Sequence, residues 1–305
     1  MVRLTKKFNC YYHQNSLFNQ RRIYNDNRRV SLCELRISIS IIAIIVYLII
    51  NYTEMAFYDL SKKERAILVE DISKKLLAEL QTGKEINVRH YFSDEDTYIR
   101  KSAYLSMGRI YFAYPPLQSN IIRLLNLLLQ DDNFKIRQTA INAAGEIGKI
   151  NFEIVQPIFD ISLFDKHYAP RNAVIGSIKK MGAVNPYPVL GWAKKYLHHS
   201  NPEIRREICH GIELRGRTHP EDILPLLQEL QFDTKARVRN NLIHVIGQIA
   251  YKKGCLKTVI THLKTWKNKE LVQDALEEII DVHERYKDFS FFTTEQAKLY
   301  ISTHF

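Results

Sequence analysis

Residues 131–147 read DDNFKIRQTAINAAGEI, and this pattern recurs along the chain. An acidic turn leads to an apolar residue and Arg137, a small residue follows three positions after the arginine, and a glycine and an isoleucine come after it. Similar stretches carry Arg100 with Gly108 upstream and Arg239 with Gly247 downstream. Self-similarity at a fixed period is the sequence signature of repeat architectures. The sequence therefore indicates an array of repeated units.

The period of this pattern is 34 residues. Two weaker copies, residues 165–171 and 201–205, lie between the strong ones. The arginines that mark the copies, called the marker arginines below, are Arg100, Arg137, Arg171, Arg205 and Arg239. Their spacings are 37, 34, 34 and 34 residues. One further step of 34 reaches Gln273, in an apolar-periodic segment without the arginine, as is common for a terminal repeat.

Each marker segment follows another amphipathic segment. These preceding segments are residues 117–129, 154–164, 187–197, 223–230 and 256–266. Pro116, Pro186 and Pro220 stand before three of them, where proline at a helix start costs little. One helix pair cannot bury its apolar face alone, but stacked pairs share a continuous core. The sequence therefore predicts an all-α fold, a right-handed α-solenoid of HEAT-like helical repeats with about six helix pairs, over residues 55–305.

Residues 1–54 differ in composition from the repeats. They are rich in Asn, Arg and Tyr and contain an apolar run over residues 37–50, whose 14 residues fall short of the roughly 20 that a bilayer core requires. Ser61 followed by Glu64 has the spacing of a capping box, so a first helix begins soon after Met55. We expect residues 1–54 to be a non-native or disordered extension. An N-terminal anchor with its Arg-rich flank in the cytoplasm is the alternative.

The charge and the cysteines limit the function only broadly. The formal net charge is +11, of which residues 1–54 contribute +5 and the remainder, with 36 Lys/Arg and 30 Asp/Glu, contributes +6. This surplus permits nucleic-acid binding without demanding it. The four cysteines form no Cys-x-x-Cys pair, and Cys209 and Cys255 are expected to pack as small apolar residues in a reducing compartment. We therefore expect a cytoplasmic protein.

The marker arginines admit two interpretations. Each could pair with an acidic turn of its own or an adjacent repeat, such as Asp165 or Asp233, and hold the repeats in register. Alternatively, some could face the concave surface and bind phosphates. Further basic residues at the ends of second helices in two consecutive repeats favour a stripe along one face, and a solvated convex face is the alternative. The predicted DNA-binding residues are Arg205, Arg206, Arg215, Arg217, Lys235, Arg237 and Arg239.

Motifs that carry chemistry are few. No HExxH motif or Cys/His cluster gives metal-ligand spacing, and GxxxxGK[ST], GxGxxG and GxSxG are absent, so neither a metal nor a cofactor is predicted. Trp192 and Tyr196 are candidates to line a groove and stack on a nucleotide, although burial is the commoner fate of such residues. Glu207, His210 and Glu213 fall on one predicted helix, which we interpret as a charged helix face rather than an acid/base set.

The C-terminal half contains a more specific order of residues. Trp192 is followed by the turn HSNPEIRR (residues 199–206), the Leu-rich segment ILPLLQEL (residues 223–230), the segment VRNNL (residues 238–242) and a closing Trp266. In this order the chain resembles the HEAT-like DNA alkylation repair family, the AlkC/AlkD group of bacterial 3-methyladenine DNA glycosylases. The resemblance covers roughly residues 187–280 and implies duplex DNA bound on a concave basic face. In active members of that family, aromatic residues and a carboxylate assist excision of alkylated bases.

The resemblance is interrupted after the Arg-Arg pair. Where the family tends to carry Ser-Glu-Gly-Thr-Arg-Pro, residues 209–214 read CHGIEL, so His210 and Glu213 replace the family's glutamate and arginine. Asp160 and Asp165 lie in roughly the repeat that would carry the family's carboxylate, but turn positions explain them equally well. Whether the protein is an enzyme therefore stays open.

These observations lead to two hypotheses. The first is a HEAT-repeat protein that grips duplex or damaged DNA along a concave basic face. The second is a protein–protein interaction scaffold without catalysis, whose concave face would be mixed in charge or apolar. A membrane partner is not expected.

Overall fold

The computed structural model describes residues 56–305. The chain divides into two units, Met1–Met55 and Ala56–Phe305, and only the second lies within the described residues. The predicted extension over residues 1–54, with its apolar run, falls outside them. Every regular element in residues 56–305 is helical, and none of the helices there has the length and hydrophobicity needed to cross a membrane.

Six helix pairs follow one another along residues 86–285, which confirms the predicted solenoid. The first helices of the pairs are α3 (Ile86–Ser93), α5 (Gln118–Leu128), α7 (Phe152–Ser162), α9 (Pro186–Tyr196), α12 (Pro220–Gln228) and α14 (Cys255–Leu263). The second helices are α4 (Thr97–Ala113), α6 (Phe134–Gly148), α8 (Tyr168–Val184), α10 (Pro202–Gly211) with its continuation α11 (Glu213–Gly216), α13 (Ala236–Ala250) and α15 (Lys269–Arg285). We call these two sets the first row and the second row.

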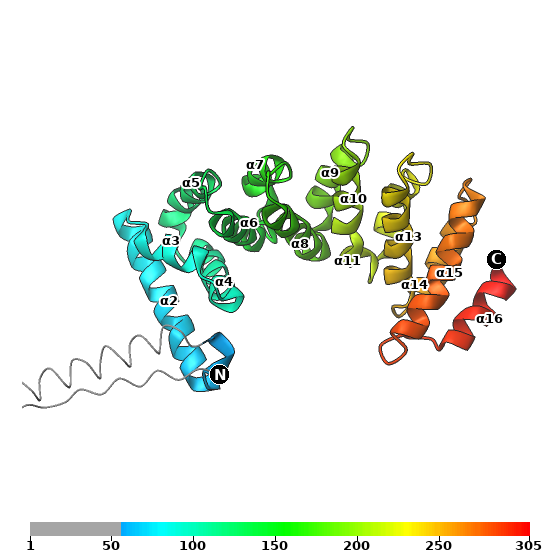
Figure 1. Ribbon diagram of the computed structural model, residues 1–305, viewed down its shortest axis with the longest axis horizontal. Coiled ribbons are helices and arrows are strands. Elements are labelled where there is room, and N and C mark those ends of the chain that lie inside the picture. Colours follow the sequence, from blue (N-terminus) through cyan, green and yellow to red (C-terminus); the bar gives the residue numbers. More distant parts are fainter. Residues whose placement is uncertain (1–55) are drawn as a thin grey trace, which may run out of the picture. The chain divides into compact units, whose positions relative to one another are not determined.

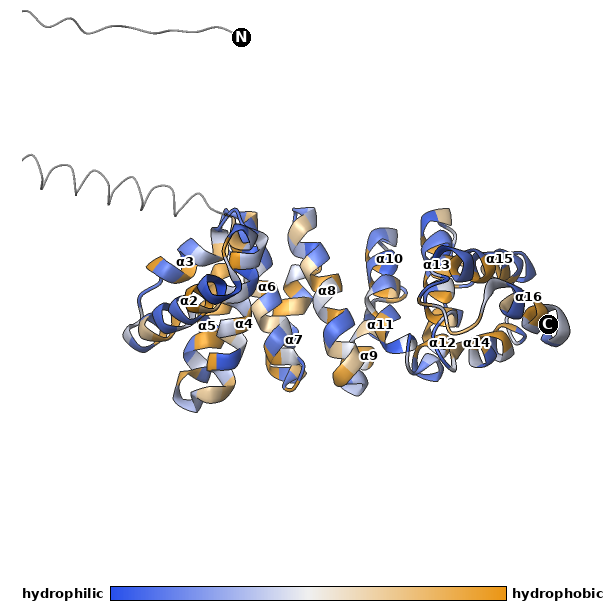
Figure 2. Cartoon of the chain, turned by 90° about the horizontal axis from the view of Figure 1, so that it is seen from below, coloured by the Kyte–Doolittle hydropathy of each residue, from blue (hydrophilic) through white to orange (hydrophobic). Residues whose placement is uncertain are grey.

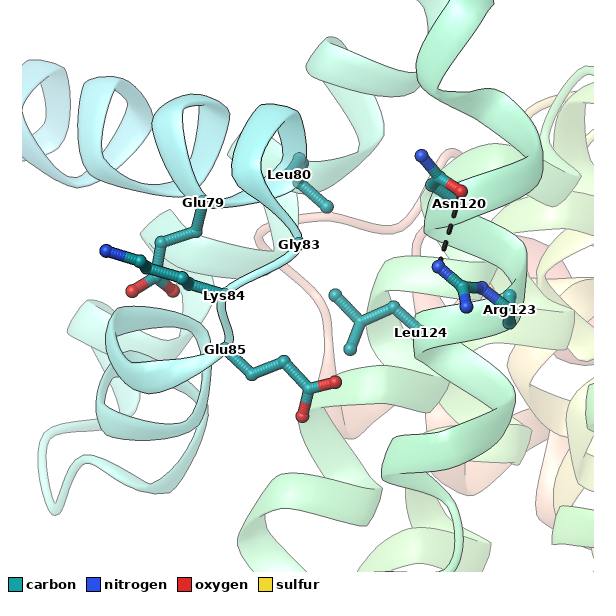
Figure 3. Close-up of a pocket in the computed structure, with 8 residues that line it drawn as sticks. All are labelled: Glu79, Leu80, Gly83, Lys84, Glu85, Asn120, Arg123 and Leu124. Carbon is teal, nitrogen blue, oxygen red and sulfur yellow. Dashed lines mark hydrogen bonds between the residues drawn. The ribbon is translucent and has the colours of Figure 1, made fainter.

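Two further helices flank the pairs. α2 (Lys62–Thr82) precedes them, with the predicted capping box between Ser61 and Glu64 in place, and α16 (Thr294–His304) packs against α15. Two short 3₁₀ turns, η1 (Phe57–Asp59) and η2 (Pro115–Leu117), complete the set. A small pocket of about 50 Å³ lies between the end of α2, the turn that follows it and α5, and Figure 3 draws the residues that line it. Its buried Glu79 accepts hydrogen bonds from the backbone N–H groups of Asn87 (2.8 Å) and Val88 (3.0 Å), so this carboxylate caps α3.

Five of the six second helices, all but α13, start where the side chain of the N-cap residue satisfies a free N–H group. Asp96, Asn133, Asn201 and Asn268 each accept a backbone hydrogen bond in the first turn of their helix, and His167 does so through Nδ1. Such N-cap bonds are the usual reason that a helix begins at Asn or Asp. The starts of the second row are therefore fixed by local sequence.

Neighbouring second helices pack directly on one another along the array, and in Figure 1 the row α4, α6, α8 lies on the inner side of the arc while α5 and α7 lie outside it. The glycine that recurs in the repeat pattern is explained by helix packing. A Cβ on Gly145 would lie 2.4 Å from Oγ of Ser177 on α8, and one on Gly247 would lie 2.7 Å from Cγ of Glu278 on α15. Glycine thus permits the close approach of adjacent second helices.

A continuous apolar core lies between the two rows. Both tryptophans, Trp192 and Trp266, are fully buried in it. Cys209 and Cys255 are buried free thiols, as predicted, and burial raises the pKa of Cys209 to about 12. Because helices of the first row pack on the second helices, the side of a second helix that stays open to solvent is the one away from this core.

Candidate nucleic-acid interface

The marker arginines close the turn within each helix pair. The Nη1 group of Arg137 donates to the carbonyl of Asp131 (2.8 Å), six residues earlier. The same bond joins Arg171 to the carbonyl of Asp165 (2.7 Å). It recurs at the other three marker arginines, from Arg100 to Asp94, from Arg205 to His199 and from Arg239 to Asp233. The regular recurrence of Arg in the sequence is therefore explained by the turn.

Three of these arginines also bind the next repeat, two of them through its acidic turn. Arg137 forms a bidentate pair with Asp165 (2.7 and 3.0 Å), and Arg205 forms one with Asp233 (2.5 and 2.9 Å). Burial opposes ionisation of both aspartates, but the hydrogen bonds from the guanidinium groups and from backbone N–H groups outweigh it and lower the pKa of each. The corresponding position after Arg171 is His199, so Arg171 contacts Glu207 instead (3.3 Å). We call this set of contacts the turn edge.

The other predicted DNA-binding residues fall into two separate groups. Arg206 on α10 and Arg237 on α13 meet at the carboxylate of Glu203, at 2.6 and 3.2 Å, beside the exposed Lys235. Arg237 keeps 73% of its side chain exposed. On α11 and directly after it, Arg215 pairs with Asp222 (2.7 Å) and Arg217 pairs with Glu213. The predicted stripe is thus divided: the structure brings Arg206 and Arg237 together, while Lys235 lies exposed at the N-cap of α13.

The two aromatic candidates lie on the first row. Trp192 is 1% exposed, and its indole N–H donates to Oδ1 of Asp160 (2.6 Å). The hydroxyl of Tyr196 donates to the same oxygen (2.7 Å). Burial, reinforced by this bond, raises the pKa of Tyr196. The structure therefore joins Asp160 to both aromatics, within α7 and α9, and Trp192 packs edge-on against Phe152 in the core.

Sequence reasoning did not identify a row of polar side chains on the second helices. The residues one position after the marker positions are Lys101, Gln138, Asn172, Arg206, Asn240 and Asp274, and each is exposed or half-buried. All but the last carry hydrogen-bond donors. The repeat register itself was the signal that could have found them. Arg109 and Lys180, nine positions after their marker arginines, are also exposed, and Lys180 reaches the ring of Tyr104 on α4 (5.4 Å).

The charge of the second row changes along the array. The second helices from α4 to α13 contain thirteen Lys/Arg and four Asp/Glu, a net of +9, whereas α15 contains two Lys/Arg and six Asp/Glu, a net of −4. Figure 2, seen from below the arc of Figure 1, shows hydrophilic residues on α8, α10 and α13. The basic surplus includes the marker arginines, which the turn edge occupies. The second helices therefore carry a net positive charge from α4 to α13 and a net negative charge at α15.

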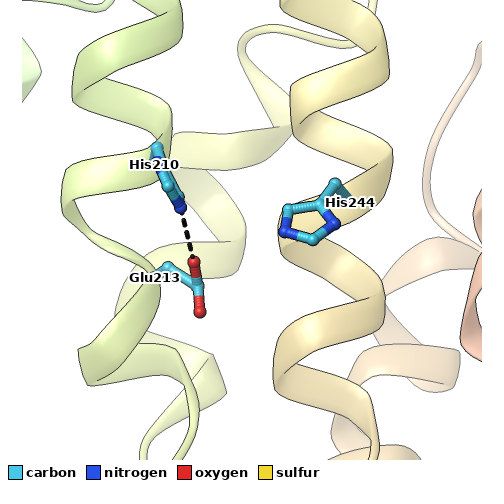
Figure 4. Close-up of side chains that lie close together, drawn as sticks. All are labelled: His210, Glu213 and His244. Atoms are coloured by element: carbon cyan, nitrogen blue, oxygen red, sulfur yellow. Dashed lines mark ion pairs between the residues drawn. The ribbon is translucent and has the colours of Figure 1, made fainter. Parts of the chain in front are cut away.

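A compact cluster of titratable groups lies in the middle of this row (Figure 4). Nitrogen atoms of His210 and His244 and a carboxylate oxygen of Glu213 lie within 4.8 Å of one another, a donor set suited to a divalent metal. However, the ammonium of Lys179 lies 2.8 Å from Nε2 of His210 and 2.9 Å from Oε2 of Glu213. Arg217 binds the other oxygen of Glu213. The place of a cation is thus taken by protein cations.

The interpretation of Glu207, His210 and Glu213 as a charged helix face is wrong for the two carboxylates. Glu207 is 3% and Glu213 is 1% exposed, and the helix is interrupted between them at Ile212. Burial opposes ionisation of Glu213, but the hydrogen bond from His210 and the charge of Lys179 lower its pKa to about 2. Burial raises the pKa of Glu207.

The comparisons with known proteins concern structure. Neither the protein-family models nor the curated proteins contain a match. Among solved structures, AlkD2 from Streptococcus mutans is similar with 18% identity over 67% of this chain and 97% of its own, at a TM-score of 0.46. The protein smu.31 from Streptococcus mutans UA159 has 20% identity over 58% of this chain and 94% of its own, at 0.44. A Crescerin structure, from a TOG domain array, has 22% identity over 60% and 85%, at 0.43. At these identities the likeness concerns the arrangement of helices.

Proposed function

We propose that the inner side of the second row, from α4 to α13, binds the phosphate backbone of duplex DNA. The observation that carries the proposal is the register row of exposed or half-buried donors at Lys101, Gln138, Asn172, Arg206 and Asn240, one on each of five consecutive second helices. Neighbouring helices pack about 8–10 Å apart. The five donors are separated by four such spacings and therefore span about 32–40 Å, comparable with the roughly 34 Å of one turn of duplex.

The chemistry of this row suits phosphate oxygens rather than base edges. Lys, Arg, Asn and Gln side chains donate to phosphates without reading sequence, and they give register and affinity. The moderate charge surplus of the second row supplies the electrostatic attraction. Among the residues predicted from sequence, Arg206, Lys235 and Arg237 belong to this surface, whereas Arg205, Arg215 and Arg239 contribute by holding the turns and helices that present it. The resemblance of residues 187–280 to DNA alkylation repair proteins agrees with this proposal.

The test is a salt-titrated affinity measurement on the full chain. Binding of a fluorescently labelled duplex should weaken steeply between about 50 and 200 mM salt, because bound phosphates release counterions. Lys101→Gln and Arg206→Gln should each reduce the slope of log K against log salt by about 1. Lys195→Gln is the matched control, since Lys195 is an exposed lysine on the first-row helix α9. Absence of binding at low salt, or equal slopes for all three variants, contradicts the proposal.

The acidic helix α15 supports a second candidate, a protein scaffold. Asp274, Glu277, Asp281 and Glu284 are exposed on α15, a surface that repels DNA and attracts a basic protein segment. If the duplex is not bound, this face is the one to test. A basic peptide should then bind the wild type and lose affinity with Glu277→Gln plus Asp281→Asn.

A further inference from the structure

The two central repeats lack a glycine that three other repeats carry in their second helix. Eight residues after the marker position, three repeats carry glycine, at Gly108, Gly145 and Gly247. The two central repeats carry Lys179 and Glu213 at that position. The three repeats with glycine pack without an ion pair at this position, so packing alone does not require the Lys179–Glu213 pair. Its presence in the two central repeats therefore calls for a functional reason.

We call the cluster of Lys179, His210, Arg217 and His244, together with Glu213, the central seam. In it, a buried carboxylate holds two cationic side chains in place. Lys179 lies between Nε2 of His210 (2.8 Å) and Oε2 of Glu213 (2.9 Å), and Arg217 contacts the second oxygen of Glu213. Arg217 also donates to Oε1 of Gln248 (3.0 Å). Glu213, which is almost fully buried, therefore holds an ammonium and a guanidinium from below while both keep part of their surface exposed.

Several donors in the central seam have no partner among residues 56–305. The contacts of Lys179 use at most two of the three hydrogens of its ammonium, since the tautomer of His210 decides whether its Nε2 accepts from Lys179. Nη1 of Arg217 makes no hydrogen bond there, and neither does the amide nitrogen of Gln248, whose side chain is 4% exposed. An unpaired buried donor is costly, so the amide of Gln248, near the partly exposed Lys179 and Arg217, points to an acceptor that binds from outside.

The net charge of the central seam determines whether this ligand is an anion or a cation. Lys179 and Arg217 contribute two positive charges against one on Glu213, so the seam has a surplus of one before either histidine is protonated. Beyond it, Glu278 on α15 faces His244 (3.5 Å) and Arg285 (3.7 Å), which balances its charge. A divalent cation would have to displace the ammonium from His210 and Glu213. An anion with several acceptor oxygens meets the unused donors directly.

We infer that the central seam of Lys179, His210, Arg217 and His244 binds a single phosphate group, with Glu213 as the positioning residue beneath it. The source of the phosphate rests on the proposed function: in DNA binding it is one backbone phosphate, and otherwise it is free inorganic phosphate. The site differs from the register row in being built from buried partners.

Two titrations on the full chain test this inference. In the first, inorganic phosphate is added and the ring resonances of His210 and His244 are followed by NMR; saturable shifts are expected, and they should weaken at least tenfold in Lys179→Gln but not in Lys195→Gln. In the second, the salt slope of duplex binding is measured for the same variants, and Lys179→Gln should lower it by about 1.

The outcomes separate the two proposals. Phosphate-dependent shifts in a protein that does not bind duplex would uphold the site and remove the DNA function. Duplex binding with equal slopes for Lys179→Gln and Lys195→Gln, and no shift with phosphate, would overturn the site alone. Shifts with Zn²⁺ but none with phosphate would also overturn it. Should Lys179→Gln fail to fold by circular dichroism, the partly exposed His244→Gln replaces it, and a phosphate affinity equal to the wild type then rejects the site.

Discussion

Arg205 at the turn edge and Lys179 in the central seam are both partly covered cations of one array, but their donors are used differently. Arg205 gives its hydrogens to Asp233 and to the carbonyls of His199 and Ser200. Lys179 retains a free hydrogen above a buried carboxylate. The first residue repeats at a fixed period, and the second breaks the period. The comparison teaches that recurrence in a repeat array reports packing, whereas departure from it reports a site.

The largest expected effect is at the turn edge. Arg137→Gln should lower the free energy of unfolding by about 3 kcal/mol, because it leaves Asp165 as an unpaired buried charge. Arg100→Gln is the matched control, since Arg100 bonds only to carbonyls and to Thr97, and about 1 kcal/mol is expected. Urea unfolding gives both values. Equal losses for the two variants would show that the ion pair of Arg137 with Asp165 in the next repeat adds nothing to the stability.

Glu213 in the central seam should make the largest contribution to the loss of unfolding free energy at acidic pH. The folded pKa of Glu213 is lowered from 4.5 to about 2, so its contribution is complete above the unfolded value and is lost as pH falls through the folded one. A shift of this size corresponds to about 3 kcal/mol at most. Wild type and Glu213→Gln should therefore converge in stability between pH 4.5 and 2, beyond what other carboxylates cause. Parallel curves would contradict the assignment of the buried charge.

A smaller effect compares two glycines of the second row. Gly145→Ala places a Cβ 2.4 Å from Oγ of Ser177 and should cost about 2 kcal/mol, since the helices must separate. Gly176→Ala, on α8, meets no atom within 4 Å and should stabilise by about 0.5–1 kcal/mol through helix propensity. Thermal unfolding of the two variants measures the difference. If both variants change the stability in the same direction, the interface between α6 and α8 is not closely packed.

The sequence was sufficient for the array and insufficient for the site. The helix predicted over residues 117–129 is α5 at Gln118–Leu128, because apolar periodicity follows the core directly. The destination of a guanidinium depends on the neighbouring repeat, as Arg137 and Asp165 lie 28 residues apart. Periodicity left both interpretations of the marker arginines open for that reason. The break at Ile212, which turns Glu213 into a buried carboxylate, also had no local signal.

The smallest effect concerns the first row. Asp160→Asn keeps an oxygen that can accept from Trp192 and Tyr196 but removes its charge, so a loss of about 1 kcal/mol in unfolding free energy is expected. Tyr196→Phe should cost a similar amount, and the double variant less than the sum, since the first change weakens the same bond that the second removes. Duplex affinity and its salt slope should stay at the wild-type values, because Asp160 lies on α7, away from the second row. A change in slope would place this aromatic cluster on the DNA-binding surface and would contradict its assignment to packing.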